Sequence, residues 1–283
     1  MTLASCDSRK TAGENPFFTE WDTPHGVPPF DKILPEHFMP AFERGMSLHE
    51  AEIDAITSNK DEATFENTIL AYDNAGQMLA QTELVFGMLC AAETNDRMQA
   101  LQEQAMPLLA AHRDKIRLDD KLFVRVKEVY DRRAALGLDA EQMRLLQKTY
   151  DSFVRAGALL DAEQKARLKE INGQLSLTAV KFGNNILAEN NNFVLELKSD
   201  ELDGLPAGIR DAAREKAQQM GKGDKWVFTL HKPSLIPLLT YSTRRDLREK
   251  IYKAYLNRCN NGDEYDNKQL INDFIRLRTE KAH

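Results

Sequence analysis

The residues whose chemistry is easiest to recognise are the histidines, because two histidines four residues apart on a helix can bind one zinc ion. The chain contains His25, His37, His49, His112, His231 and His283. No two of these are four residues apart. His49-Glu50 begins a His-Glu-x-x-His pattern, but Ile53 occupies the position of the second ligand. The sequence therefore favours an exposed histidine on a helix face at position 49, and it predicts no zinc site within these residues.

Other residue sets that mark catalytic sites are also missing from the sequence. There is no Gly-x-Ser-x-Gly elbow, no Gly-x-x-x-x-Gly-Lys phosphate loop and no Cys-x-x-Cys pair. The three cysteines, Cys6, Cys90 and Cys259, are odd in number and far apart, so no disulfide framework is indicated. Carboxylates are abundant, but on amphipathic helices they mostly form a solvated face. We therefore predict no catalytic residue in this segment.

Composition narrows the class of protein. The chain of 283 residues is 42% hydrophobic and 29% charged, which is typical of a helix-rich globular protein. Its net charge is −6, and its basic residues are interleaved with acidic ones. Nucleic acid is not an expected partner, because phosphate binding needs clustered, uncompensated Lys and Arg. No apolar run approaches the ~18 residues of a transmembrane helix.

The elements that would position any site are mainly helices. Apolar side chains recur every three to four residues over six stretches, at about 38–57, 64–89, 95–116, 119–136, 139–157 and 161–186. Pro107 lies inside the third stretch and is expected to kink it. Short connections favour antiparallel neighbours, so we predict a mostly α, bundle-like body.

The last third of the chain has a different pattern. Residues 193–197 and 226–230 are predicted to be two short strands with a helix from Pro206 to Met220 between them, and their relative direction stays open. Two basic helices follow within residues 243–283, the first capped by Ser242 or Thr243 and the second by Asp266 or Asn267. The expected domains are 1–27 (tether and lead-in), 28–190 (helical) and 191–283 (small β element and helices).

Five strings carry a family resemblance, in this order: PFDKILPEHFMPAFERGM, FENTILAYDNAG, FVLELKSDELDGLP, KWVFTLHKPSLIPLL and the segment 243–283. Together they resemble the N-terminal helical half of the M3-family zinc oligopeptidases, and the first string is most similar to bacterial peptidyl-dipeptidases. In that family a proline-containing loop follows the strand that corresponds to residues 226–230.

The resemblance implies a zinc metallopeptidase that cleaves short peptides, with release of C-terminal dipeptides as the implied activity and endopeptidase action left open. It also implies that this segment forms one wall of a substrate channel and is inactive alone. The zinc ligands and the nucleophilic water would come from a catalytic half outside these residues. Arg276, Arg278 and Lys281 are candidates for contacts with the peptide or with that half, and the simpler interpretation is that they are solvated charges on a helix face. The alternative is a stand-alone helical scaffold or peptide-binding module.

The first residues of the chain suggest where in the cell the protein is located. Leu3-Ala4-Ser5-Cys6 resembles the lipobox at which bacterial lipoproteins are cleaved and lipidated on the cysteine, and a polar tether follows. We therefore expect a lipid anchor at Cys6 and a place in the bacterial cell envelope or periplasm. A cytoplasmic location is the alternative.

Overall fold

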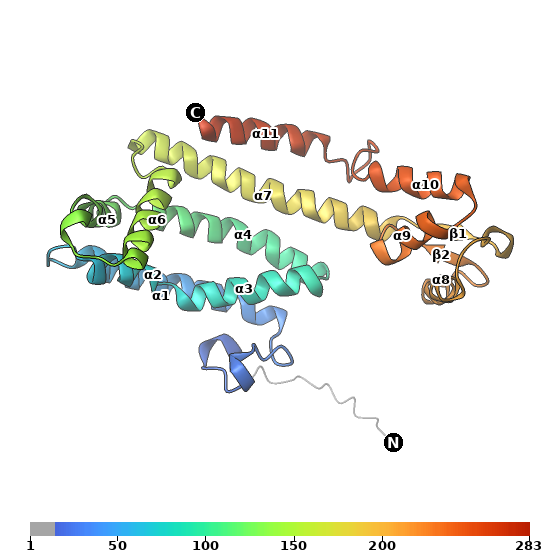
Figure 1. Cartoon of the computed structure of the whole chain (residues 1–283), viewed down its shortest axis with the longest axis horizontal. Coiled ribbons are helices and arrows are strands. Elements are labelled where there is room, and N and C mark those ends of the chain that lie inside the picture. Colours follow the sequence, from blue (N-terminus) through green and yellow to red (C-terminus); the bar gives the residue numbers. More distant parts are fainter. Residues whose placement is uncertain (1–14) are drawn as a thin grey trace, which may run out of the picture. The chain divides into compact units, whose positions relative to one another are not determined.

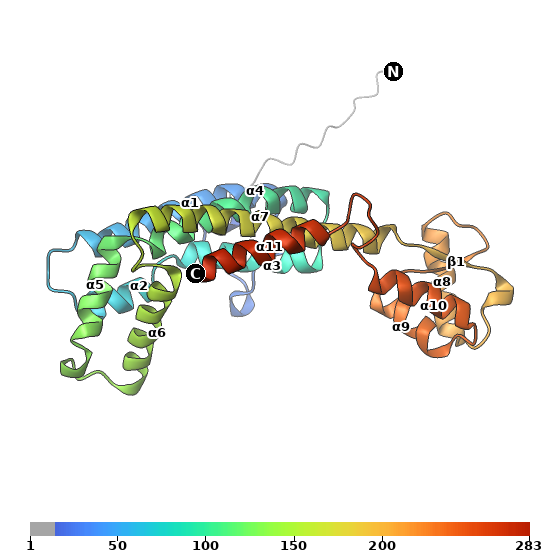
Figure 2. The same ribbon diagram turned by 90° about the horizontal axis from the view of Figure 1, so that it is seen from above.

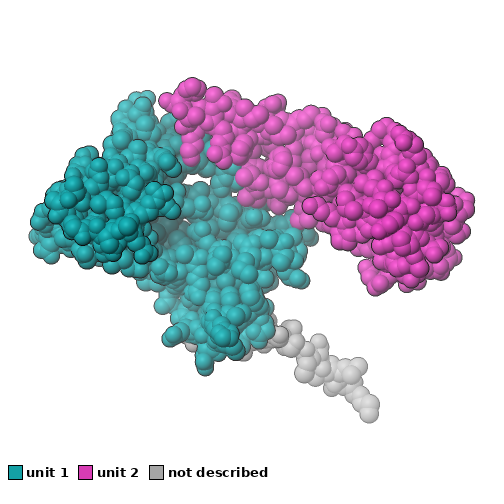
Figure 3. All heavy atoms as spheres, viewed as in Figure 1, with its two compact units in different colours: residues 1–177 teal, residues 178–283 magenta. Residues whose placement is uncertain are grey.

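The computed structural model describes residues 15–283, which are mostly α-helical with one two-stranded sheet. The predicted fold class is confirmed. The chain forms two compact units, of which unit 1 ends at Leu177 and unit 2 runs from Thr178 to His283 (Figure 3). Among the described residues no helix has the length and apolar character needed to cross a membrane. The domain boundaries expected at 27/28 and 190/191 stay predictions.

Unit 1 is built from helices joined by short turns (Figures 1 and 2). Its main elements are α1 (Phe38–Ser58), a π-helix (Phe65–Leu70), α2 (Ala71–Asp73), α3 (Gln77–Ala92), α4 (Asp96–Arg117), α5 (Asp120–Asp131), α6 (Ala140–Ala156) and the first part of α7 (Ala162–Asn192). Short 3-10 turns cover Pro16–Phe18, Pro24–Gly26, Pro35–His37 and Arg133–Ala135. Pro107 lies inside α4, which continues on both sides of it.

Side-chain caps fix where these helices begin. Asn95 accepts a hydrogen bond from the amide of Met98 at 3.1 Å, which caps α4. Asp139 and Gln142 form a reciprocal capping box at the start of α6. Each such cap satisfies backbone N–H groups that the helix itself leaves unpaired, and is worth about 1 kcal/mol. The starts that the sequence predicted for these two helices are confirmed.

The long helix predicted over 64–89 is wrong, because the chain turns between α2 and α3. Gly76 has a φ of +75°, and a Cβ atom there would lie 2.9 Å from Nδ1 of His49. Only glycine accepts both the left-handed backbone and this close approach. The apolar period continues across the break, but Ile69 packs in one hydrophobic cluster and Phe86 in another. Two helices with separate cores therefore share one apparent period.

The two clusters form the core of unit 1. One gathers buried side chains of α1, the π-helix, α5 and α6, including Ile53, Ile69, Val126 and Phe153. The other centres on Phe38, Phe42 and Phe86, and the Phe86 ring lies edge-on to the other two rings at 4.9 and 5.3 Å between centroids. Burying each such side chain contributes about 1.5–3 kcal/mol. Helix α1 contributes to both clusters and so holds unit 1 together.

Unit 2 contains the rest of the chain, and its hydrophobic core surrounds a small sheet. Its elements are the end of α7, β1 (Leu195–Leu197), α8 (Ala207–Gln219), β2 (Trp226–Phe228), α9 (Lys232–Tyr241), α10 (Arg245–Leu256) and α11 (Lys268–Ala282). A 3-10 turn covers Ser199–Glu201. The strands pair antiparallel with Leu195 opposite Phe228, which settles their direction. Leu197, Leu238 and Ile251 are fully buried in the core of this unit.

Three local expectations for unit 2 need correction or refinement. Residues 232–241 form helix α9 rather than a loop, since Pro233 lies in the first turn, where its missing N–H costs nothing. The N-cap of α10 is Arg244, with no side-chain cap bond, and not Ser242 or Thr243. The sequence predicted Asp266 or Asn267 as the N-cap of α11, and the structure has Asn267. Asp266 instead accepts a hydrogen bond from the Lys268 amide at 2.9 Å.

Candidate functional site

A pair of histidines links α1 to α4 in unit 1. Nε2 of His112 lies 3.1 Å from Nδ1 of His49, and the His112 residue is only 5% exposed. Nδ1 of His112 lies 3.5 Å from a carboxylate oxygen of Glu50, and that carboxylate pairs with Lys115 at 2.8 Å. The expectation that His49 is an exposed helix-face residue is wrong, because His49 is half-buried against His112.

Glu50 favours one arrangement of protons in this pair. A proton on Nδ1 of His112 points a positive N–H end at the Glu50 carboxylate, and the other tautomer would point a lone pair at it. With that proton in place, Nε2 of His112 accepts the hydrogen bond that His49 donates. Burial lowers the pKa of both imidazoles, and positive charge on His112 lowers the pKa of His49 further. The pair is therefore held neutral near pH 7.

The histidine pair also packs against the turn before α3. Glu52 accepts a hydrogen bond from the Gly76 amide at 2.7 Å, and the ring of His49 fills the space where a Cβ of residue 76 would lie. The three helices α1, α3 and α4 thus meet at one polar contact. Apart from Nδ1 of His112, which approaches Glu50 without a hydrogen bond among residues 15–283, its groups pair with one another. The contact is therefore suited to fixing helices rather than to binding a reactant.

The zinc ion that the family resemblance implies does not fit these donors. Glu50 approaches Nδ1 of His112 while His49 approaches Nε2, so the three groups lie at two different edges of one ring. A zinc ligand set has to converge on a single point. Over residues 15–283 there is no group of three or more His, Cys, Asp or Glu side chains that could hold a metal ion. No zinc site can therefore be assigned among residues 15–283.

Thiol chemistry is equally poorly supported in the described residues. Cys90 is half-buried and Cys259 is buried, and both thiols are free. Burial is the main reason why the pKa of each thiol is raised to about 11. Because the thiolate is the reactive form, both side chains are inert at neutral pH.

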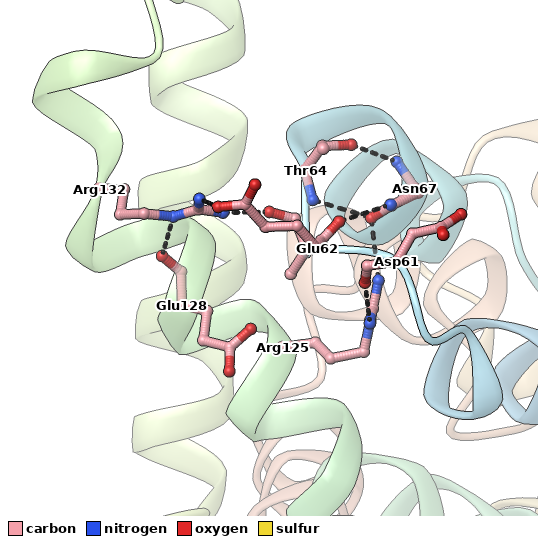
Figure 4. Close-up of polar contacts among 8 residues, drawn as sticks. Asp61, Glu62, Thr64, Asn67, Arg125, Glu128 and Arg132 are labelled. Carbon is pink, nitrogen blue, oxygen red and sulfur yellow. Dashed lines mark hydrogen bonds and ion pairs between the residues drawn. The ribbon is translucent and has the colours of Figure 1, made fainter.

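A second polar cluster fixes the loop between α1 and the π-helix (Figure 4). Arg125 of α5 is 9% exposed and donates to the carbonyl oxygens of Asn59 and Asp61 at 2.9 and 3.1 Å. Its other terminal nitrogen donates to the side-chain oxygen of Asn67 at 3.1 Å. Nε of Arg125 is buried and has no hydrogen-bond partner among residues 15–283. We call this set of contacts the Arg125 cluster.

Two further sets of contacts hold the loop between α1 and the π-helix in place. Arg132, about two helical turns after Arg125, donates to the carbonyl oxygen of Ala63 and forms an ion pair with Glu62. Thr64 and Asn67 cap the π-helix reciprocally, at 2.8 and 3.1 Å. Asn67 also lines a pocket of about 360 Å³ between α1 and the segment 67–75, and its other lining residues are Glu52, Ala55, Ile56, Ala71, Asn74 and Ala75. The Arg125 cluster carries no acid–base pair, and its chemistry is structural.

The residues that the sequence singled out lie elsewhere. Arg276, Arg278 and Lys281 are exposed on α11. Arg276 pairs with Asp273 at 3.5 Å, and the guanidinium of Arg278 lies 5.0 Å from the centre of the Phe274 ring. Their contact with a peptide or with a second half of a peptidase stays a prediction. Cys6 lies outside the described residues.

Comparison with known proteins identifies the family. No family model matches the chain. Dipeptidyl carboxypeptidase of Escherichia coli (strain K12) is 35% identical over 269 residues, which is 95% of this chain and 40% of the relative. A dipeptidyl carboxypeptidase of Salmonella typhimurium is 33% identical over 93% of this chain and 39% of its own length. Oligopeptidase A of Escherichia coli (strain K12) is 26% identical over 92% of this chain and 39% of its own length.

The chain belongs to the M3 family of dipeptidyl carboxypeptidase and oligopeptidase A. It spans about two fifths of the length of the curated relatives it matches, in their N-terminal part. The family resemblance that the five strings carried is confirmed. The Arg125 cluster and the histidine pair thus lie in a chain that matches the N-terminal part of these relatives.

Proposed function

We propose that this chain is the N-terminal, non-catalytic part of a zinc metallopeptidase that releases dipeptides from the carboxyl ends of short peptides. The observation that carries the proposal is the 35% identity to a dipeptidyl carboxypeptidase along 95% of the chain. Identity to oligopeptidase A over a similar length is lower, at 26%. This difference favours dipeptide release over internal cleavage.

In this proposal the segment forms one wall of the channel that admits the peptide. Zinc would activate the attacking water in the complete enzyme, with ligands outside these residues. The support is the donor geometry of the described residues, where the histidine pair and Glu50 do not converge on one point. Arg276, Arg278 and Lys281 are proposed to contact the peptide or the catalytic part from α11.

The test uses the full-length protein that contains this chain. It is incubated with an amino-blocked pentapeptide that has a free carboxyl end, and the products are identified by mass spectrometry. We expect stepwise release of a dipeptide, with loss of cleavage when the carboxyl end is amidated. The 283-residue chain alone, tested in parallel, is expected to hold no stoichiometric zinc by elemental analysis and to leave the peptide intact.

The other outcomes separate the alternatives. Cleavage at an internal bond, unaffected by amidation, would overturn dipeptide release and leave an oligopeptidase. Peptide binding without any cleavage by the full-length, zinc-supplied protein would support the scaffold or peptide-binding module instead. Stoichiometric zinc in the 283-residue chain would contradict the assignment of the ligands to a different part of the protein.

A further inference from the structure

Helix α10 and the residue before it are strongly basic within an acidic chain. Residues 244–253 contain five basic and two acidic side chains, although the whole chain has a net charge of −6. Both acidic groups already have partners. Asp246 receives two hydrogen bonds from Arg244, at 3.0 and 2.8 Å, and Glu249 pairs with Lys253 at 2.5 Å. The remaining positive charge of this stretch is carried by Arg245, Arg248 and Lys250.

Two of these cations line a pocket between α9 and α10. The pocket has a volume of about 400 Å³, and its lining residues are Leu239, Arg245, Arg248, Glu249, Tyr252 and Lys253. Arg245, Arg248 and Tyr252 recur at intervals of three and four residues, which places them along one face of α10. Leu239 of α9 supplies an apolar wall. We call this feature the α9–α10 pocket.

The guanidinium groups of the pocket differ in how firmly they are held. Arg248 is half-buried and donates one N–H to the carbonyl oxygen of Ser242, which fixes the group in place. Arg245 is exposed, and its charge contributes to the low pKa of Glu249, for which pairing with Lys253 is the larger cause. Each guanidinium has five N–H donors, so donors of both remain to bind an anion. A fixed guanidinium loses less conformational entropy on binding than a free one.

This chemistry favours a particular ligand. Planar guanidinium groups bind carboxylates with two parallel hydrogen bonds. The half-exposed ring of Tyr252 and the side chain of Leu239 offer apolar surface beside the cations. A peptide that carries a carboxylate next to an apolar side chain fits both features. A nucleic acid fits poorly, because a long polyanion would also meet the net negative charge of the chain.

We propose that the α9–α10 pocket binds a peptide carboxylate that lies next to an apolar residue. The carboxylate can come from an acidic side chain or from a free carboxyl end, because both present the same two oxygens. The proposal rests on unit 2 alone and does not depend on the proposed peptidase activity. It assigns to this segment a ligand-binding site of its own.

The test measures binding of short labelled peptides to the 283-residue chain by fluorescence anisotropy. Three hexapeptides differ only at the end: Leu-Glu amide, Leu-Gln with a free carboxyl end, and Leu-Gln amide as the neutral control. We expect the neutral control to bind at least tenfold more weakly than the better of the two charged peptides. Which charged peptide binds better distinguishes a side-chain carboxylate from a terminal one.

Variants locate the site. Arg245→Gln and Arg248→Gln should each weaken binding of the preferred peptide about tenfold, the effect of losing one charge-assisted hydrogen-bonded pair. Arg245 is exposed and holds no backbone carbonyl, so Arg245→Gln tests the site even if Arg248→Gln disturbs the start of α10. Arg210→Gln is the matched control, because Arg210 is exposed on α8, outside the pocket. It should change binding less than twofold.

Several results would overturn the proposal. Equal binding of the neutral peptide would show that the carboxylate is not recognised. An equal loss with Arg210→Gln would show non-specific attraction between charges. No binding of any peptide, or tighter binding of a single-stranded oligonucleotide than of the charged peptides, would also refute it.

Discussion

Replacing Arg125 by methionine is the sharpest test of how unit 1 is held together. The side chain is buried and makes a hydrogen bond to the carbonyl oxygen of Asn59. It makes further hydrogen bonds to Asp61 and Asn67 (Figure 4). Methionine has a similar length and no charge, so it keeps most of the packing and removes these bonds. We expect the free energy of unfolding of unit 1 to fall by about 2–3 kcal/mol.

The expected loss of unfolding free energy in Arg125→Met is the balance of opposing effects. Hydrogen bonds from a charged donor contribute about 1.5–3 kcal/mol each, so three of them set an upper limit near 5–9 kcal/mol. Two effects reduce the loss. Residues 59–61 are partly or fully exposed, so water can replace the guanidinium at their carbonyl groups. Methionine also avoids the cost of burying a guanidinium whose Nε has no partner.

The assay has to separate unit 1 from unit 2. The chain has two tryptophans, Trp21 in unit 1 and Trp226 in unit 2. In a Trp226→Phe background, the fluorescence of Trp21 follows urea unfolding of unit 1. Hydrogen exchange of residues 59–67 should also rise in Arg125→Met, because the loop that Arg125 holds can open without global unfolding.

Two control variants interpret the result. Arg144→Met changes an exposed arginine of α6 and should shift stability by less than about 0.5 kcal/mol. Arg125→Lys keeps the charge but cannot form the fork that reaches both carbonyl groups and Asn67, so it should restore less than half of the loss. A stability equal to the parent, or an increase, in Arg125→Met would refute the structural role of the Arg125 cluster.

Two further predictions concern protonation and location. The pKa values of His49 and His112 are lowered from 6.5 in the folded state, so the unfolded chain binds protons first as the pH falls. The free energy of unfolding should thus be at its full value above about pH 6.5 and decline below it. His112→Gln should flatten this decline, as measured by urea unfolding at a series of pH values. An unchanged pH dependence in His112→Gln would argue against the histidine pair as the cause of the decline. We further expect the native protein to sediment with membranes through a lipid on Cys6, and Cys6→Ser to release it; a wild-type protein that stays in the soluble fraction would contradict the lipobox interpretation.

The helices of unit 1 could be predicted because their signals are local. Asn95 and Asp139 mark helix starts through bonds that span only three residues, and the apolar period shows which face is inward. The break at Gly76 was missed for a reason that is not local. The apolar period on both sides is the same, and only the existence of two separate cores makes a turn there favourable. Helix α9 was missed because the family resemblance implied a proline-containing loop after the second strand.

The polar contacts of unit 1 depend on pairs that lie far apart in the sequence. His49 and His112 are 63 residues apart, and Arg125 reaches back 66 residues to Asn59. Nothing in the sequence gives these pairings. A partial signal was nevertheless present, because His112 follows Leu109 and precedes Ile116 at helical spacing and is therefore on the inward face of α4.

Arg125 carries the same signal on α5, next to the buried residues Leu122, Val126 and Val129. A charged side chain at an inward position must find partners, because burying it without hydrogen bonds costs several kcal/mol. Its partners then have to come from a segment whose carbonyl groups are free, and a loop between two helices is the natural source. By this argument an inward arginine in an amphipathic pattern predicts a fixed loop, even when the sequence does not show which loop it fixes.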